Sequence, residues 1–140
     1  MGFFARLFGS PSSAPSPEPS GFLKGPGTFQ LPIVGESHYQ DELEAICGGR
    51  TEEGEDLLTE ALLVLEDSNP YDPEAVRVDI DGRTVGHLSR ENACEYRRRL
   101  VEAGHPRLRA RCRARIRGGW DRGADDRGHF GVWIDLPTGD

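Results

Sequence analysis

A short polar turn at residues 69–73, NPYDP, carries the groups in this sequence that are best suited to chemistry. Asn69 offers an amide that donates and accepts hydrogen bonds, Tyr71 offers a flat ring, and Asp72 offers a carboxylate that only accepts. The two prolines restrict the backbone, so we expect these groups to be held in place. A ring that stacks on a base and a carboxylate that accepts from a sugar hydroxyl suit the end of a nucleotide chain. The alternative is a turn that only reverses the chain.

The second chemical feature is an alternation of arginine with small apolar residues. A period of two is typical of a strand that points apolar side chains inward and guanidinium groups outward. Guanidinium groups bind phosphate and stack on bases, so this strand is a candidate phosphate track. The alternative is a solvated face balanced by acidic residues of the same domain, of which residues 52–60 could pair with it directly. The arginines of this basic track are Arg107, Arg109, Arg111, Arg113, Arg115 and Arg117.

The net charge of −7 is distributed unevenly. Residues 1–90 contain 6 Lys/Arg and 16 Asp/Glu, whereas residues 91–140 contain 11 Arg and 8 Asp/Glu. Salt screens charges that lie more than about 8–10 Å apart, so a polyanion responds to a local basic stripe more than to the total charge. The acidic total therefore does not exclude a nucleic-acid partner.

Other kinds of site are not indicated. Cys47, Cys94 and Cys112 are odd in number and form no C-x-x-C pair, so we expect reduced thiols and a cytoplasmic protein. No histidine pair has the spacing of zinc ligands, and residues 67–72 lack the pattern of a calcium loop. Motifs for phosphate-cradling loops, nucleophile elbows and zinc proteases are missing as well. We therefore expect no enzyme activity, no metal and no cofactor.

The elements that must position these groups are mostly strands. Alternating and β-branched residues predict strands at 29–34, 61–65, 75–80, 84–88, 107–117 and 129–136. Helices are predicted at 40–47 and from residue 90 to about 102, and the acidic stretch 50–60 is expected to be a loop. This set favours a fold that is mostly β with two helices, arranged as a small, mostly antiparallel barrel or sandwich.

Residues 1–27 are expected to precede the domain, which spans 28–137. Prolines and serines dominate residues 10–27, a composition typical of a linker. Residues 1–9 place four apolar side chains at helical spacing, which suits docking on a membrane surface or on a protein partner. A frayed tail is the alternative. No apolar run is long enough to span a bilayer.

The middle of the chain resembles the HIRAN domain, a module of certain helicase-like remodellers of chromatin and replication forks that also occurs as a stand-alone bacterial protein. The resemblance implies a six-stranded OB-like barrel that binds single-stranded DNA and prefers a free 3′-hydroxyl end. Helicase and ATPase activities belong to other parts of the larger proteins and are not implied. The matching stretches are NPYD at 69–72, AVRV at 75–78, DG at 81–82 and VGHL at 85–88, with Arg90, Ala93 and, upstream, IVG at 33–35 and Tyr39.

The resemblance also implies roles for individual residues. Tyr71 would stack on the terminal base, and Phe130 would close the pocket on the other face of that base. Asp72 would accept a hydrogen bond from the 3′-hydroxyl, and Asn69 would contact the terminal nucleotide.

The adjacent phosphate would be held by His87 and Arg90. The chain departs from the members that bind DNA ends at Ser37 and His38, where those members carry Arg and an aromatic residue, although His38 could still stack. Glu74 stands where Asn is common. If all three positions face the pocket, they should weaken end binding by roughly a few kcal/mol. A protein-interaction domain that keeps the barrel without DNA-end binding is the alternative.

Overall fold

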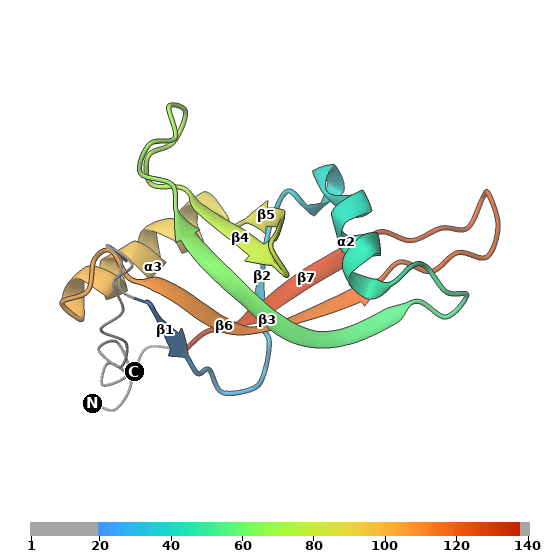
Figure 1. Ribbon diagram of the computed structural model, residues 1–140, viewed down its shortest axis with the longest axis horizontal. Coiled ribbons are helices and arrows are strands. Elements are labelled where there is room, and N and C mark those ends of the chain that lie inside the picture. Colours follow the sequence, from blue (N-terminus) through green and yellow to red (C-terminus); the bar gives the residue numbers. More distant parts are fainter. Residues whose placement is uncertain (1–19, 138–140) are drawn as a thin grey trace, which may run out of the picture.

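The computed structural model describes residues 20–137, in which one long sheet curls into a barrel-like shape (Figure 1). Neighbouring strands follow the order β2-β7-β6-β3-β4-β5 and pair antiparallel, while β1 pairs in parallel with the beginning of β6. The strands are β1 (Ser20–Leu23), β2 (Leu31–Pro32), β3 (Glu55–Leu65), β4 (Val76–Ile80), β5 (Arg83–His87), β6 (Arg109–Gly118) and β7 (Phe130–Asp135). This architecture confirms the predicted fold class of a mostly β, OB-like antiparallel barrel with two helices.

The two ends of the curled sheet are joined by one antiparallel bridge. Val34, just after β2, donates its N–H to the carbonyl oxygen of His87 at 2.8 Å, and His87 donates back to Val34 at 2.9 Å. His87 is the last residue of β5, at the far end of the strand order. The bridge therefore closes the barrel at a residue that was predicted to contact phosphate.

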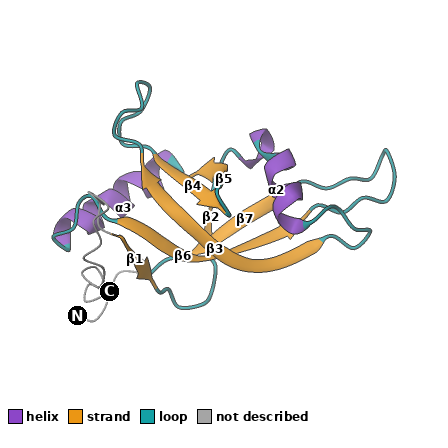
Figure 2. Ribbon diagram, in the orientation of Figure 1, coloured by secondary structure: helices purple, strands orange, loops and turns teal. Residues whose placement is uncertain are grey.

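Two α-helices lie toward opposite ends of the sheet, as Figure 2 shows. The helix α2 (Gln40–Cys47) follows a short 3-10 turn, η2 (Glu36–His38), and ends at Gly48, whose φ of 82° suits glycine. The helix α3 (Arg90–Glu102) packs Tyr96 and Leu100 into the core. The ranges of both helices confirm the prediction, which succeeded because the residues that end a helix lie next to it in the sequence.

Replacing Ser89 with Ala should destabilise the protein by about 1 kcal/mol, because the Ser89 hydroxyl caps α3 by accepting a hydrogen bond from the Asn92 N–H at 3.1 Å. Urea denaturation measures the change. Ser68→Ala is the control, since Ser68 is exposed in the β3–β4 connection. Equal stability of both variants would show that the cap is not used.

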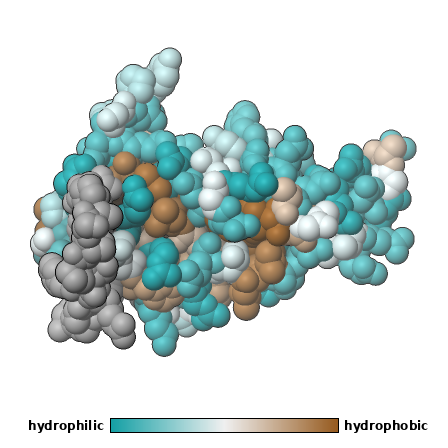
Figure 3. All heavy atoms as spheres, viewed as in Figure 1, coloured by the Kyte–Doolittle hydropathy of each residue, from teal (hydrophilic) through white to brown (hydrophobic). Residues whose placement is uncertain are grey.

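The core takes one face of the sheet. Along β6, Ala110, Cys112, Ala114 and Ile116 are fully buried, while the arginines between them point to the other side. Burial raises the pKa of the Cys112 thiol to about 12, so this cysteine stays neutral and packs as an apolar residue. On the face seen in Figure 3 the surface is mostly hydrophilic, with apolar residues in separate patches.

Three parts of the sheet differ from the prediction. The strand predicted at 29–34 is reduced to β2, Leu31–Pro32. Residues 20–27 were assigned to a linker, but Ser20–Leu23 forms β1 and aligns with residues 109–112 of β6. Residues 50–60 were assigned to a loop, but β3 already begins at Glu55. Two acidic side chains concealed this strand, because they lie on the same face as the arginines of β6: Asp56 pairs with Arg115, and Glu60 pairs with Arg111.

Residues 1–19 and 138–140 lie outside the described part, and with them the predicted apolar face at residues 1–9. From residue 20 to 137, no helix has both the length and the apolarity that crossing a membrane requires. Nor does this part of the chain bring three His, Cys, Asp or Glu side chains together as metal ligands.

Candidate functional site

The connection between β3 and β4 projects from the sheet and carries the NPYD turn (Figure 1). Tyr71 is 92% exposed, so both faces of its ring are open to solvent. The side chain of Asn69 builds the turn: its Oδ1 accepts from the backbone N–H of Tyr71 at 2.8 Å and of Asp72 at 3.2 Å. This Asx turn occupies the Asn69 oxygen, so Asn69 organises the loop and is poorly placed to accept from a ligand.

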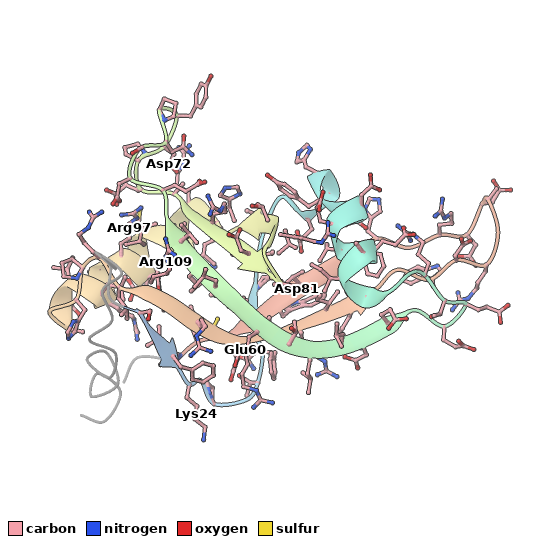
Figure 4. The ribbon with its side chains drawn as sticks, viewed as in Figure 1. Lys24, Glu60, Asp72, Asp81, Arg97 and Arg109 are labelled. Atoms are coloured by element: carbon pink, nitrogen blue, oxygen red, sulfur yellow. The ribbon has the colours of Figure 1, made fainter. Side chains whose placement is uncertain are left out.

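Asp72, labelled in Figure 4 on the projecting connection, lies close to the exposed cation of Arg90. Its Oδ1 accepts from the Glu74 N–H at 3.0 Å, and its Oδ2 lies 3.7 Å from Nε of Arg90 at the start of α3. The Arg90 side chain is 81% exposed and remains accessible to a phosphate. The pair therefore offers one carboxylate oxygen for a hydroxyl donor and one guanidinium for a phosphate.

His87 is tied to the turn by a residue that was not predicted. Its Nε2 lies 3.1 Å from Oε1 of Glu66, and the same oxygen accepts from Nδ2 of Asn69 at 3.3 Å. The Glu66 side chain is 20% exposed, and its other oxygen lies 3.5 Å from Arg77. Four predicted residues, Asn69, Asp72, His87 and Arg90, are thus linked by contacts at the base of the exposed Tyr71.

Arg97 holds the turn from the side of α3 and was not predicted as a site residue either. Its guanidinium donates to the carbonyl oxygens of Glu74 at 2.7 Å and Ala75 at 2.9 Å, and to Asp67 at 2.8 Å. The hydrogen bond from Arg97 lowers the pKa of Asp67 below its ordinary value. The sequence held one usable signal: Arg97 follows Arg90 by about two helical turns and so lies on the same side of α3.

Phe130 is not brought to the turn. It is 1% exposed, and the Arg50 guanidinium lies 5.0 Å from its ring centroid. Gln40 contacts its backbone N–H and carbonyl oxygen at 2.8 and 3.0 Å. A ring buried in this way offers no face to a base, so its predicted role does not fit this geometry.

The three departures from the family pattern occupy different surroundings. Ser37 lines a groove of about 540 Å³ together with Phe130 and Trp133, and neither Tyr71 nor Asp72 lines that groove. His38 is exposed on η2. Glu74 is exposed directly after the turn, and its backbone N–H donates a hydrogen bond to Oδ1 of Asp72. Of these three residues, only Glu74 lies beside the turn, where it adds a negative charge.

The basic track is partly neutralised by carboxylates. Arg107 binds Asp67 at 3.0 Å, Arg111 binds Glu60 at 2.8 Å, and Arg115 binds Asp56 through two bonds of 2.7 Å. These pairs follow the alternative interpretation of a balanced solvated face. In the described part of the chain, Arg113 and Arg117 make no ion pair, and Arg113 instead covers the Phe29 ring at 5.5 Å.

One end of the basic track reaches the turn. Arg107 and Arg109 line a small cleft with Asp67, the acidic residue that also binds Arg97. A strand bound at Tyr71 and Arg90 would therefore find further arginines at the base of the same connection.

A model of the HIRAN domain matches residues 26–117, more than half of the chain. Searches of curated proteins and of solved structures gave no match. The matched range contains the NPYD turn, the closing bridge at His87, Arg90 and the arginines of β6, and it ends before Phe130.

Proposed function

The chain belongs to the HIRAN domain family, and from this membership and the turn geometry we propose that it binds single-stranded DNA at a free 3′-hydroxyl end. Family membership implies a nucleic-acid-binding module. The observation that supports the finer proposal is the exposed ring of Tyr71 next to the Asp72–Arg90 pair. These groups match, in order, a base, a hydroxyl and a phosphate.

In this proposal each group reads one part of the terminal nucleotide. The last base stacks on the Tyr71 ring, a contact that tolerates any base because every base has a π-face. The 3′-hydroxyl donates to Oδ2 of Asp72, and the phosphate on its 5′ side pairs with Arg90. A terminal 3′-phosphate would bring negative charge to the Asp72 carboxylate, and this repulsion provides the discrimination.

The test is fluorescence anisotropy with a ten-nucleotide thymidine strand, labelled at its 5′ end and terminated by either a 3′-hydroxyl or a 3′-phosphate. We expect the 3′-hydroxyl strand to bind more tightly by roughly tenfold, the order expected for one lost charge-assisted hydrogen bond. Equal affinities would refute end recognition. No binding even at low salt would refute the nucleic-acid proposal as a whole.

Arg90→Gln should weaken the 3′-hydroxyl and 3′-phosphate strands alike and reduce the slope of log K against log salt by about 0.7, the value for one contact to a single strand. Arg83→Gln is the matched control, because Arg83 carries the same charge but is paired with Glu42 at 2.9 Å on β5. Anisotropy over a salt series measures both slopes. A slope that falls equally in both variants would contradict a direct phosphate contact at Arg90.

The second candidate function is a protein-interaction domain. The pairing of Arg107, Arg111 and Arg115 with carboxylates favours it, because it leaves fewer arginines for phosphate. Recovery of a protein partner after nuclease treatment, together with failure to bind oligonucleotides, would identify this function.

The proposal includes no catalysis and a cytoplasmic location. Free thiols at Cys47, Cys94 and Cys112 are compatible with a reducing compartment. Nuclease and ATPase assays test the first point, and any turnover abolished by a substitution in the turn would overturn it.

A further inference from the structure

The carboxylate of Glu66 stands where the turn, the closing bridge and β4 meet. It follows directly after β3 and is mostly buried. Its Oε1 is shared by Nδ2 of Asn69 at 3.3 Å and Nε2 of His87 at 3.1 Å, and its Oε2 lies 3.5 Å from Arg77. One side chain thus contacts residues from three separate segments.

Glu66 fixes the orientation of the Asn69 amide. A carboxylate only accepts hydrogen bonds, so the Asn69 NH₂ group must point toward Glu66 and its Oδ1 must point the other way. That oxygen accepts from the N–H groups of Tyr71 and Asp72. A flipped amide would face these two donors with a third donor, so the Glu66 contact favours the one orientation that builds the turn.

Glu66 also fixes the ring of His87. Its carboxylate requires a proton on Nε2, which leaves Nδ1 as the other ring nitrogen that can meet a ligand. The backbone of His87 forms the closing bridge with Val34 at 2.8 and 2.9 Å. The same carboxylate therefore connects the projecting turn to the point where the barrel closes.

The third partner, Arg77, keeps the carboxylate in place. Arg77 lies opposite His87 in the β4–β5 register. It is itself held by Asp79 through two hydrogen bonds of 3.0 and 3.1 Å, and Thr84 donates to the same aspartate at 3.0 Å. The hydrogen bonds that Arg77 donates to the Asp79 carboxylate raise the pKa of Arg77 above its ordinary value, so its positive charge is secured. If the Glu66 carboxylate moved away from Asn69, it would also lose its contact with the Arg77 guanidinium.

We propose that Glu66 is a positioning residue for end recognition: it holds the Asn69 amide, and with it Tyr71 and Asp72, in register with the His87 imidazole. This inference rests on the proposed function, because it assigns the residue that makes the same site selective. Glu66 does not contact the DNA. Its negative charge is satisfied by Asn69, His87 and Arg77, so it orients the reading groups without repelling the phosphates directly.

The test compares Glu66→Ala and Glu66→Gln with Glu60→Ala, which removes an exposed β3 carboxylate that pairs with Arg111. The readout is the ratio of affinities for 3′-hydroxyl and 3′-phosphate strands, measured well below the unfolding temperature of each variant. Loss of the hydrogen bonds that order the turn should lower this ratio by about fivefold in Glu66→Ala. Glu66→Gln keeps an accepting oxygen and should give an intermediate ratio, and Glu60→Ala should keep the wild-type ratio. A purely structural role would lower the unfolding temperature but leave the ratio unchanged.

A second readout without DNA separates the two claims. Hydrogen exchange of the Tyr71 and Asp72 amides should accelerate in Glu66→Ala by about fivefold more than that of the core Ala114 amide, since the acceptor of both turn amides loses its anchor, whereas Ala114 reports only the change in global stability. A wild-type protein that does not distinguish the two ends refutes the proposed function and this inference with it. A wild-type protein that does distinguish them, with ratio and exchange both unchanged in Glu66→Ala, refutes the role of Glu66 alone.

Discussion

Tyr71→Ala is expected to weaken binding of a 3′-hydroxyl single strand by roughly 5- to 150-fold, because stacking of one base on an aromatic ring contributes about 1–3 kcal/mol. Tyr71 is the most exposed of the large hydrophobic residues in the described part of the chain, at 92%, so its ring contributes little to packing in the folded protein. Anisotropy with the labelled ten-nucleotide strand measures the loss.

The controls for this variant separate stacking from folding. Tyr71→Phe keeps the ring and should bind nearly as well as the wild type. Because so little of Tyr71 is buried, the stability of Tyr71→Ala should stay within about 0.5 kcal/mol of the wild type. Wild-type affinity in Tyr71→Ala would remove the ring from the binding site.

The largest effect on stability is expected for Asp135→Ala, which should cost about 2–4 kcal/mol because it strips two backbone donors of their acceptor. Asp135 is the buried charged residue at the end of β7, with 2% exposure. Its two oxygens each accept from the Gly27 N–H at 3.0 Å, and Oδ1 also accepts from the Phe29 N–H at 3.3 Å. The carboxylate thereby ties the loop between β1 and β2 to the sheet.

Gly25 lets the loop between β1 and β2 pass close to Asp135. A Cβ atom at Gly25 would lie 2.7 Å from the Asp135 carbonyl carbon and 2.8 Å from its side chain, closer than packing allows. Urea denaturation of Asp135→Ala tests the prediction, with Asp125→Ala as control, because Asp125 is exposed in the β6–β7 loop. A cost below about 1 kcal/mol would show that water replaces the carboxylate as acceptor.

Elements whose signals are local were predicted well from the sequence. The alternation along β6 and β4 identified two strands, because one buried face imposes a period of two. The two helix ranges were predicted because the groups that satisfy the terminal backbone atoms lie within a few residues: the Ser89 side chain caps α3, and Gly48 follows the last residue of α2. The NPYD turn was found for the same reason.

Features that depend on distant partners were not predicted. The strand β1 is stabilised by β6, some ninety residues away, and nothing within residues 20–27 indicates that pairing. The first half of β3 was predicted as a loop because its sequence is acidic, and the partners of Asp56 and Glu60 are arginines of the distant strand β6. Glu66 and Arg97 were not predicted as site residues for the same reason. Glu66 acts through its contact with His87, and Arg97 through hydrogen bonds to two backbone carbonyl oxygens beside the turn.

The central claim is that the NPYD turn reads a 3′-hydroxyl end, and a nuclear magnetic resonance titration tests it at the site itself. A short thymidine strand with a 3′-hydroxyl is added to isotope-labelled protein, followed by the same strand with a 3′-phosphate. The account predicts that the amide signals of Asn69, Tyr71 and Asp72 and the ring signals of Tyr71 shift strongly with the hydroxyl end and much less with the phosphate end. Shifts confined to the arginines of β6, or identical shifts with both ends, would contradict it.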